Sequence, residues 1–391
     1  MTTLGVFFTR GVSLKQWVEL GLFDREVLIY HEHLRNGLFD GIEWFTYGSA
    51  DAAMAAQLAR DGRLSPAIQV VPRPHWFRYL GRGGNLIYML LMPFLAWRRL
   101  KRCDVFKTNQ MDGAIAALAA ARLLRRPLFV RTGYTHSLFV DQIHASNPLR
   151  RRLAEFTEKL AFRHCDAASV SSRFDRDYIV ERYGPDVRAP LVLGNYIDVD
   201  RFSPRPGKSR SDRLIFVGRL SPQKNLAAAI RACAQAHVGL DVIGDGPDRK
   251  ALHELAADLK ADVRWLGVFP NERLPERLAE YRFFYLPSLW EGMPKALLEA
   301  MAAGLVCIGN DTTGINEVIE DGVTGYLSKG ADPAALATAI RRALSGDVDA
   351  VSAAARDFVS RNFSLSEIVR QEREIFSALM ANTRFGAGST A

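Results

Sequence analysis

The chain has 391 residues, of which 48% are hydrophobic and 24% charged, and a formal net charge of +8. This length predicts two domains, each large enough to bury its own core, and the ordinary composition excludes a disordered or fibrous chain. The charge is uneven: residues 1–204 contain 28 Lys and Arg against 20 Asp and Glu, whereas residues 205–391 contain 23 of each. We therefore expect the first half to meet an anionic partner.

The cysteine pattern and the first residues give expectations about location. Cys103, Cys165, Cys233 and Cys307 are widely scattered and show no metal-ligand spacing. We expect them to be reduced thiols in a cytoplasmic protein. The opening residues, MTTLGVFFTRGVSL, lack a basic leader followed by a long apolar core, so no signal peptide is expected.

Short apolar runs alternate with helical patterns through the first half. A capping box of Ser13 and Gln16 predicts the start of a helix over Ser13–Arg35, interrupted near Gly21, and a second helix is expected over Asp112–Leu124. The expected strands are Leu4–Thr9, Ile42–Tyr47, Ile68–Val71, Val105–Thr108, Leu128–Arg131 and Ala168–Ser171.

The most apolar window is LIYMLLMPFLAW at 86–97, followed by the basic run RRLKR at 98–102. It has 12 residues, contains Pro93, and is shorter than the roughly 18–20 residues that a spanning helix needs. Two interpretations are open: a helix lying on an anionic lipid surface, or a buried helix with one exposed end. The positive charge of the first half favours peripheral attachment to a membrane.

The second half repeats the alternation, and this pattern predicts parallel, doubly wound sheets. The expected strands are Leu214–Val217, Leu240–Ile243, Val263–Leu266, Phe283–Leu286, Val306–Gly309 and Gly325–Leu327. The Pro- and charge-rich stretch PRPGKSRSDR at 204–213 is interpreted as an interdomain linker. The predicted fold class is α/β, with two Rossmann-like domains facing across a cleft and ligands bound at the carboxyl ends of strands.

The second half opens with LIFVGRLSPQKNL, residues 214–226. A strand ends at Gly218, and Arg219 and Lys224 follow as the chain turns into a helix. Backbone N–H groups at a helix start favour anions; Arg219 can donate to phosphate in bidentate fashion, and Lys224 acts as a point charge. From these residues alone, an exposed turn with two solvated cations is equally open.

A second turn, VIGDGPDR at 242–249, follows the next expected strand. Gly244 and Gly246 permit a tight turn and close approach of the backbone to a ligand. Without a third glycine the pattern is weak evidence for a dinucleotide site, and an ordinary strand-to-helix turn explains it as well.

The stretch PSLWEGMPKALLEAMAAG, residues 287–304, places two acids at a helix start. Pro294 suits the first helical position, so the loop Ser288–Met293 brings Glu291 to the mouth of the helix, and Glu299 lies one to two turns inside. Either carboxylate could accept hydrogen bonds from a sugar or ribose diol. The alternatives to ligand binding are that Glu291 caps the helix and that Glu299 points into solvent. For a single glutamate on a helix, these alternatives would be preferred.

The spacing of the two acids resembles the Glu-x7-Glu motif of the retaining GT-B glycosyltransferases grouped as family 4. Four further segments are similar to that family, in the same order. They are GNYIDVDRFSP (the interdomain stretch), FVGRLSPQKN (the phosphate turn), VIGDGPDR (the glycine turn) and TTGINEVIEDGVTGYL (the segment closing the sheet). From the first of these segments to the last, the resemblance spans residues 194–327.

The resemblance implies a role for each matching residue. Arg219 and Lys224 would hold the donor diphosphate and stabilise its developing charge, Glu299 would bind the ribose, and Glu291 would face the donor sugar. The implied donor-binding set is Arg219, Lys224, Gly244, Val268, Glu291, Gly292, Met293 and Glu299. The resemblance implies no required metal or cofactor, only a nucleotide diphosphate sugar (UDP-, GDP- or ADP-sugar) as donor.

Histidines and acids elsewhere in the chain are further candidates for the site. His136 follows an expected strand where related enzymes often place a histidine near the donor sugar, with Arg131 and Tyr134 beside it; a catalytic role and an ordinary loop position are both open. The DVD sequence at 198–200 matches the Asp-x-Asp of metal-dependent transferases but lies away from the phosphate turn, and HEH at 31–33 places its histidines on different helix faces. Neither is expected to bind a metal.

The sequence therefore predicts a retaining glycosyltransferase with Glu291, Arg219, Lys224 and His136 as catalytic residues. Its domains are expected at 1–204 (acceptor side), 205–365 (donor side) and 366–391, a C-terminal helix crossing back to the first domain and a tail. It would move a hexose to a saccharide or lipid-linked saccharide in polysaccharide or lipopolysaccharide biosynthesis, at the inner membrane face and without nucleic acid. The alternatives are a GT-B nucleotide-sugar epimerase or hydrolase, and a non-catalytic sugar-nucleotide-binding subunit.

Overall fold

The protein forms two compact units. The computed structural model describes residues 1–133, 135, 137, 148–205 and 210–386. The first unit comprises Met1–Leu193 and Val369–Ala391, and the second comprises Gly194–Ile368. The chain therefore passes from one unit to the other twice.

The boundary between the units differs from the expected one. The segment 194–204, expected to end the first domain, packs in the second unit, where Ile197 and Phe202 are buried in the hydrophobic core. The backbone N–H of Ile197 donates to the carbonyl of Phe363 at 2.8 Å. Residues 194–204 already belong to the second unit, so the expected linker at 204–213 begins inside that unit.

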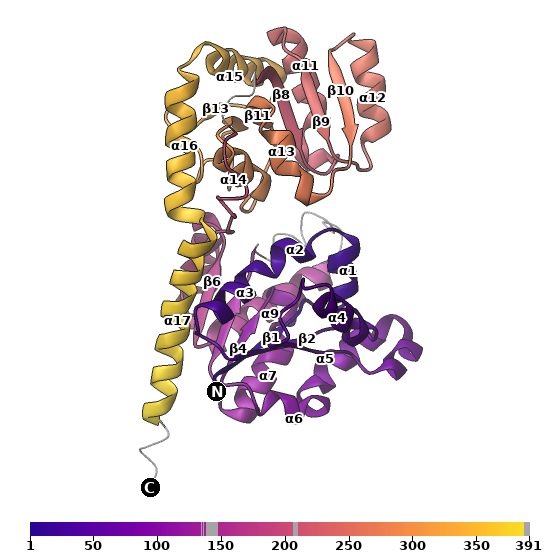
Figure 1. Ribbon diagram of the computed structural model, residues 1–391, viewed down its shortest axis with the longest axis vertical. Helices are drawn as coiled ribbons and strands as arrows, with labels where there is room; N and C mark the ends of the chain where they lie inside the picture. Colours follow the sequence, from indigo (N-terminus) through magenta and orange to yellow (C-terminus); the bar gives the residue numbers. More distant parts are fainter. Residues whose placement is uncertain (134, 136, 138–147, 206–209, 387–391) are drawn as a thin grey trace. The chain divides into compact units, whose positions relative to one another are not determined.

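The first unit is built on a seven-stranded parallel sheet in the order β3-β2-β1-β4-β5-β6-β7. Figure 1 labels β2, β1, β4 and β6 of this sheet. The strands are β1 Thr3–Phe7, β2 Gly41–Phe45, β3 Ile68–Val71, β4 Val105–Thr108, β5 Leu128–Arg131, β6 Ala167–Val170 and β7 Leu191–Val192. Each strand expected from the sequence is present. The additional strand, β7, has two residues, too few to produce a recognisable period.

The second unit is built on a six-stranded parallel sheet in the order β10-β9-β8-β11-β12-β13. The strands are β8 Ser211–Val217, β9 Leu240–Ile243, β10 Val263–Gly267, β11 Tyr281–Leu286, β12 Val306–Asn310 and β13 Tyr326–Ser328. In both sheets the strand order reverses between the first and fourth strands, as in doubly wound Rossmann-like sheets. The expected α/β class with two such sheets is confirmed.

Helices connect the strands of the first unit. They are α1 Leu14–Glu19, α2 Phe23–Glu26, α3 Leu28–Arg35, α4 Asp51–Arg60, α5 Gly84–Leu95, α6 Trp97–Leu100, α7 Ala114–Leu124, α9 Pro148–His164 and α10 Arg173–Tyr183, with 3-10 turns η1 His75–Gly83, η2 Met111–Gly113 and η3 Gly184–Asp186. The capping box of Ser13 and Gln16 is confirmed. The helix expected over Ser13–Arg35 is divided into three, and Gly21 takes a positive φ of 65° after α1.

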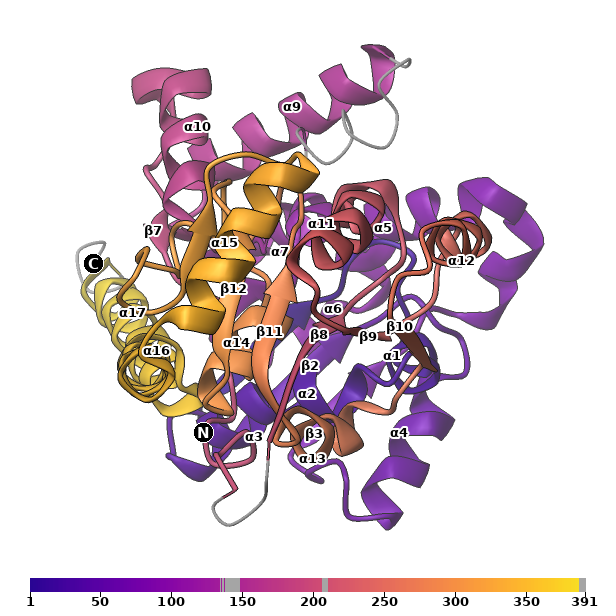
Figure 2. The same cartoon turned by 90° about the horizontal axis from the view of Figure 1, so that it is seen from above.

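The helices of the second unit pack on its sheet in two groups. They are η4 Pro222–Lys224, α11 Leu226–Ala236, α12 Arg249–Asp258, η5 Asn271–Arg273, α13 Leu274–Leu278, α14 Lys295–Ala302, α15 Pro333–Ser345 and α16 Val348–Phe363. Figure 2 shows α15, α11 and α12 side by side, and α14 packs against α16. Since both faces of the sheet are covered, its central strands β8 and β11 carry runs of buried apolar residues, at Leu214–Phe216 and Phe283–Leu286.

The last helix, α17 Leu365–Gly386, belongs to the first unit from Val369 onward. Phe376 makes edge-to-face ring contacts with Phe39 and Phe129, at 5.2 and 5.5 Å between centroids. One turn earlier, α17 places Glu372, a fully buried carboxylate, in the interior of the first unit.

Glu372 is neutralised by a buried cluster of basic groups. The ammonium of Lys107 in β4 lies 2.6 Å from both carboxylate oxygens, Nε2 of His33 lies 2.8 Å from one, and Nε of Arg131 lies 4.0 Å from the other. Burial alone raises the pKa of Glu372, but Lys107, His33 and Arg131 together lower it from 4.5 to about 2. Burial lowers the pKa of Lys107, because it disfavours the charged ammonium. The two short contacts with the carboxylate nevertheless keep Lys107 paired with Glu372.

Removing the charge of Glu372 should destabilise the first unit strongly. Glu372→Gln leaves the ammonium of Lys107 buried without a counter-charge, which costs about 3–5 kcal/mol of unfolding free energy. Glu374→Gln is the matched control, because Glu374 lies on the same helix in an exposed pair with Arg370, a type of pair worth about 0–1 kcal/mol. Urea unfolding of the two variants measures the difference.

The pH dependence follows from the lowered pKa of Glu372. A carboxyl whose folded pKa is depressed stabilises the fold above its unfolded pKa and loses that contribution as the pH falls toward the folded value. The gap in unfolding free energy between wild type and Glu372→Gln should therefore narrow from pH 4.5 toward pH 2. A gap that stays constant over this range would contradict the assignment of an ion pair.

Candidate functional site

The candidate donor site lies at one edge of the second sheet, where the strand order reverses. The strands β8 and β11 pair directly, with Phe283 opposite Leu214 and Phe284 opposite Ile215. Their carboxyl ends therefore meet at the same edge, flanked by β9 on one side and β12 on the other. This edge is where doubly wound sheets bind ligands.

The turn after β8 carries the two cations predicted from the sequence. It runs from Gly218 through the short η4 to Lys224. Arg219 is exposed. The Lys224 ammonium forms an ion pair with Glu291, and the two side chains are 16% and 9% exposed. The structure thus brings together the cation of one predicted motif and the acid of another.

The glycine turn after β9 packs directly on the turn after β8. Gly244 has φ +141°, and a Cβ placed on it would lie 1.8 Å from the carbonyl oxygen of Gly218. A Cβ on Gly246 would lie 2.2 Å from the carbonyl oxygen of Leu220, whose own N–H donates to the carbonyl of Asp245 at 2.9 Å. Only glycine permits this contact between the two turns.

The loop after β11 is held from both sides by hydrogen bonds. The Leu289 N–H donates to the carbonyl of Gln223 at 2.8 Å, and the Gln223 side chain donates back to the carbonyl of Trp290 at 2.8 Å. On the other side the N–H of Glu291 donates to the carbonyl of Thr313 at 3.2 Å. The position of Glu291 is therefore set by the backbone on either side of it.

The loop after β12 closes against the same acidic loop. Gly314 has φ +78°, and a Cβ on it would lie 2.1 Å from the carbonyl oxygen of Gly292. The hydroxyl of Thr312 donates to the carbonyl of Leu289 at 2.8 Å. Together, the turns after β9, β8, β11 and β12 form a continuous row across the edge.

The helix α14 starts one residue later than predicted. Pro294 is the N-cap, with extended backbone (ψ 105°), and Lys295 is the first helical residue. Proline still fits, because the cap residue needs no intrahelical N–H. Glu299 lies in the second turn and is 4% exposed, so its solvated alternative is wrong. Met293 is buried, and its carbonyl accepts a hydrogen bond from the side chain of Asn195 at 2.8 Å.

The remaining predicted positions are spread more widely. Val268, which follows β10, is 72% exposed. His136 and Tyr134 lie outside the described residues, and the Arg131 side chain points to the buried carboxylate of Glu372 instead. No group of three or more His, Cys, Asp or Glu in the described part of the chain could hold a metal ion.

The carboxyl edge of the first sheet carries a second polar cluster that the sequence did not single out. An ion pair joins Arg10, after β1, to Asp112 at 3.7 Å, and Arg73, after β3, donates to the side chain of Asn85 at 2.6 Å. Among the described residues, the Tyr47 hydroxyl and Nε of Arg73 are buried without a hydrogen-bond partner. Burial raises the pKa of Tyr47, so its hydroxyl remains a donor.

Sequence reasoning missed the residues that hold the donor-site loops. Three side chains donate hydrogen bonds to backbone carbonyls of the loop between β11 and α14, which contains Glu291. They are Gln223, Thr312 and Asn195. Each lies inside a segment that resembles the glycosyltransferase family, which is the signal that could have found them. Their partners, however, lie 23 to 98 residues away in the chain.

Two family models together cover most of the chain. "Glycosyltransferase Family 4" matches residues 42–201, and "Glycosyl transferases group 1" matches residues 198–358. The second match contains all four turns of the candidate donor site.

Two curated relatives of this chain are named glycosyltransferases, and a solved structure shares its fold. The amylovoran biosynthesis glycosyltransferase AmsK of Erwinia amylovora is 36% identical over 43% of this chain and 45% of its own length. The UDP-Gal:alpha-D-GlcNAc-diphosphoundecaprenol alpha-1,3-galactosyltransferase of Escherichia coli is 25% identical over 72% of this chain and 77% of its own length. The fold matches that of Anabaena HepE in complex with UDP, with a TM-score of 0.74 at 19% identity, covering 97% of this chain and all of HepE.

A methyl group at Gly244 should disrupt the contact between the two turns. Gly244→Ala forces a Cβ against the carbonyl of Gly218 at a φ that L residues rarely adopt, and we expect a loss of about 3 kcal/mol in unfolding free energy. Gly267→Ala is the control: Gly267 also has a positive φ, at 74°, but nothing lies within 4 Å of the added Cβ. Its loss should be about 1 kcal/mol. Equal losses in urea unfolding would show that the close contact is unimportant.

Proposed function

The chain belongs to the family 4 glycosyltransferases of GT-B fold, and from this premise we propose that it is a retaining hexosyltransferase. It would move a hexose from a nucleotide diphosphate sugar to a hydroxyl of a saccharide or lipid-linked saccharide. The observation that carries the proposal is the ion pair of Lys224 and Glu291 where β8 meets β11.

The donor diphosphate would bind at the turn after β8. Lys224 and Glu291 satisfy each other's charge in the structure. A diphosphate would bring negative charge to Lys224 and to the exposed Arg219, whose planar guanidinium suits phosphate oxygens. Glu291 would then be free to accept hydrogen bonds from donor sugar hydroxyls.

The nucleoside would lie along α14 and the loop after β10. Glu299 is buried in the second turn of α14, and a carboxylate there can accept both hydroxyls of a ribose. Val268 offers an exposed apolar surface to the base. Because HepE, a structural neighbour, was crystallised with UDP, we propose UDP-sugars as the first donors to test, ahead of GDP- and ADP-sugars.

Catalysis would rest on positioning and electrostatics. Lys224 and Arg219 would stabilise the negative charge that develops on the leaving diphosphate. The acceptor hydroxyl would attack from the face that the diphosphate leaves, and the leaving phosphate oxygen would take its proton, so that the anomeric configuration is retained. The site would supply the orientation that brings the hydroxyl and the anomeric carbon into contact.

The acceptor would be bound by the first unit. The carboxyl edge of its sheet carries two cations, Arg10 and Arg73, and the hydroxyl of Tyr47, which has no hydrogen-bond partner among the described residues. These groups suit an acceptor that has hydroxyl and anionic groups. AmsK is named for amylovoran biosynthesis, and the galactosyltransferase for a diphosphoundecaprenol acceptor. We therefore propose a saccharide or lipid-linked acceptor in cell-surface polysaccharide or lipopolysaccharide biosynthesis.

An apolar surface on the first unit supports the proposal that the protein attaches peripherally to the inner face of the plasma membrane. None of the described helices has the length and apolar content to span a membrane. Yet α5 buries only one side, with Tyr88 and Met92, and exposes Leu86, Ile87, Leu90, Leu91, Phe94 and Leu95 on its other sides. The preceding η1 exposes Trp76, Tyr79 and Leu80. We call these nine residues the α5 surface.

The charges around the α5 surface suit an anionic lipid layer. Arg98, Lys101 and Arg102 follow α5 directly and are exposed, and Arg78 lies within η1. Monomeric proteins rarely expose contiguous apolar surfaces of this kind without a binding partner. Apolar side chains beside basic ones are typical of helices that lie in the membrane interface.

Loss of the Lys224 charge should impair transfer. Lys224→Ala removes one of the two cations proposed for the diphosphate, and we expect kcat/KM to fall by about 100- to 1,000-fold. Lys250→Ala is the control, because Lys250 is a highly exposed lysine of the same unit on α12, and it should leave the rate unchanged. Release of nucleoside diphosphate in the presence of acceptor measures both.

A melting-temperature screen against UDP, GDP, ADP and their sugars identifies the donor, since a ligand of the folded state raises the melting temperature. The proposal of a transferase would be abandoned if no nucleotide shifted the melting temperature. It would also be abandoned if free sugar were released at the same rate with and without acceptor, which indicates a hydrolase.

Charges introduced on the α5 surface should weaken membrane binding. Leu90→Asp with Phe94→Asp removes two exposed apolar groups that would each contribute about 1.5–3 kcal/mol on burial, so the partition coefficient should fall more than tenfold. The control is Leu344→Asp, which changes an exposed leucine of the second unit. Sedimentation with phosphatidylglycerol vesicles at low salt is the measurement, and a wild-type protein that stays in solution would refute attachment.

A further inference from the structure

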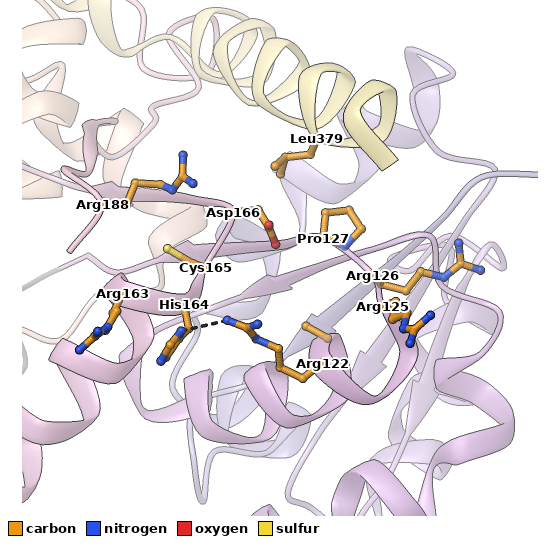
Figure 3. A pocket seen from close by; sticks show the side chains of 11 residues that line it. Arg122, Arg125, Arg126, Pro127, Arg163, His164, Cys165, Asp166, Arg188 and Leu379 are labelled. Atoms are coloured by element: carbon orange, nitrogen blue, oxygen red, sulfur yellow. Dashed lines mark hydrogen bonds between the residues drawn. The ribbon is translucent and has the colours of Figure 1, made fainter. Parts of the chain in front are cut away.

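A basic pocket of about 710 Å³ opens in the first unit at the amino ends of β5 and β6 (Figure 3). The segments that enter these strands form part of its wall, and Leu379 of α17 lines it from the other side. Because the strands are parallel, this edge of the sheet lies opposite the carboxyl edge to which the acceptor is assigned. The basic pocket is therefore separate from the proposed acceptor site, and none of its lining residues belongs to the candidate donor site.

The basic pocket gathers positive charge that the described residues around it leave largely unneutralised. Its basic side chains are the five arginines Arg122, Arg125, Arg126, Arg163 and Arg188, together with His164. Among the described residues that line it, the one acid is Asp166, and one of its oxygens already accepts a hydrogen bond from the backbone N–H of Leu128 at 2.8 Å.

Some of these groups have weak partners. A guanidinium nitrogen of Arg122 lies 2.9 Å from Nδ1 of His164, and Arg126 lies 3.7 Å from Asp104, with both side chains more than a third exposed. An exposed pair at this distance contributes little. For Arg125, Arg163 and Arg188, no ion pair or side-chain hydrogen bond is found within the described part of the chain. Figure 3 shows these side chains spread around the basic pocket, with Arg126 and Arg163 on opposite sides. Cations that line one cavity repel each other, and an anion bound among them would offset that repulsion.

Helix dipoles explain only part of the cluster. Arg122 and Arg163 lie in the last turns of α7 and α9, and Arg125 is the C-cap of α7, where basic groups complement the negative helix end. Arg126 and Arg188, however, belong to no helix. They bring charge to the basic pocket from segments more than 60 residues apart in the sequence.

We propose that the basic pocket binds a ligand bearing phosphate groups. Guanidinium groups form paired hydrogen bonds with phosphate oxygens, and the volume lies within the range of small-molecule sites. The ligand is either a soluble phosphorylated molecule or the phosphate of a lipid headgroup, which share this chemistry. The inference goes beyond the proposed transferase function, because it concerns a site apart from donor and acceptor.

Inorganic pyrophosphate is the probe for this site, in a protein whose donor site has been disabled. In Arg219→Ala with Lys224→Ala, titration calorimetry should still detect pyrophosphate binding. Adding Arg163→Ala and Arg188→Ala should weaken that binding at least tenfold, because each removes a charged donor. The matched control instead adds two substitutions at exposed arginines of the same unit outside the basic pocket, Arg35→Ala and Arg60→Ala, and should bind as the parent does.

Two results would overturn the proposal: no pyrophosphate binding once the donor site is disabled, or equal affinity with and without Arg163 and Arg188. Neither result would bear on the transferase function, which is tested by donor turnover. A second measurement distinguishes the sources of phosphate. If Arg163→Ala with Arg188→Ala weakens binding to phosphatidylglycerol vesicles as well as to pyrophosphate, the ligand is a lipid headgroup; if it weakens pyrophosphate binding alone, the ligand is a soluble phosphate.

Discussion

The candidate donor site exists because β8 pairs directly with β11. In a sheet of order β10-β9-β8-β11-β12-β13, these two parallel strands end at the same edge, so the turn after one lies beside the loop after the other. Lys224 and Glu291 meet for this reason, although 67 residues separate them in the chain. Gly244 and Gly314 then let the neighbouring turns touch through their backbones, where a side chain would hold them apart. The site therefore depends on residues without side chains as much as on charged ones.

The first unit distributes its charges differently. One carboxylate, Glu372, is buried with Lys107 and His33 and ties α17 into the unit. By contrast, the cations of the basic pocket and those beside the α5 surface lie near solvent, with few acidic partners among the described residues. Buried charges need partners within the fold, whereas exposed ones remain available to ligands. These cations of the first half of the chain therefore lie where an anionic ligand could reach them.

Much of the fold could be predicted from local patterns. Strands of covered parallel sheets are continuous apolar runs, and the capping box of Ser13 is a local signal, so both are recognisable without a structure. The spacing of Glu291 and Glu299 likewise indicated the candidate donor site, although its residue roles stay predictions. These features depend on residues that are close together in the chain.

Contacts between distant groups could not be predicted in this way. The pairing of Glu372 with Lys107 joins residues 265 positions apart. The hydrogen bond between Ile197 and Phe363 places residues 194–204 in the second unit, although the sequence had placed them in the first. The exposed sides of α5 could not be told from buried ones, because its sequence is apolar all round. The sequence by itself determined backbone preference and burial along each segment, whereas ion pairs, unit boundaries and exposed surfaces arise from contacts that form only when the chain is folded.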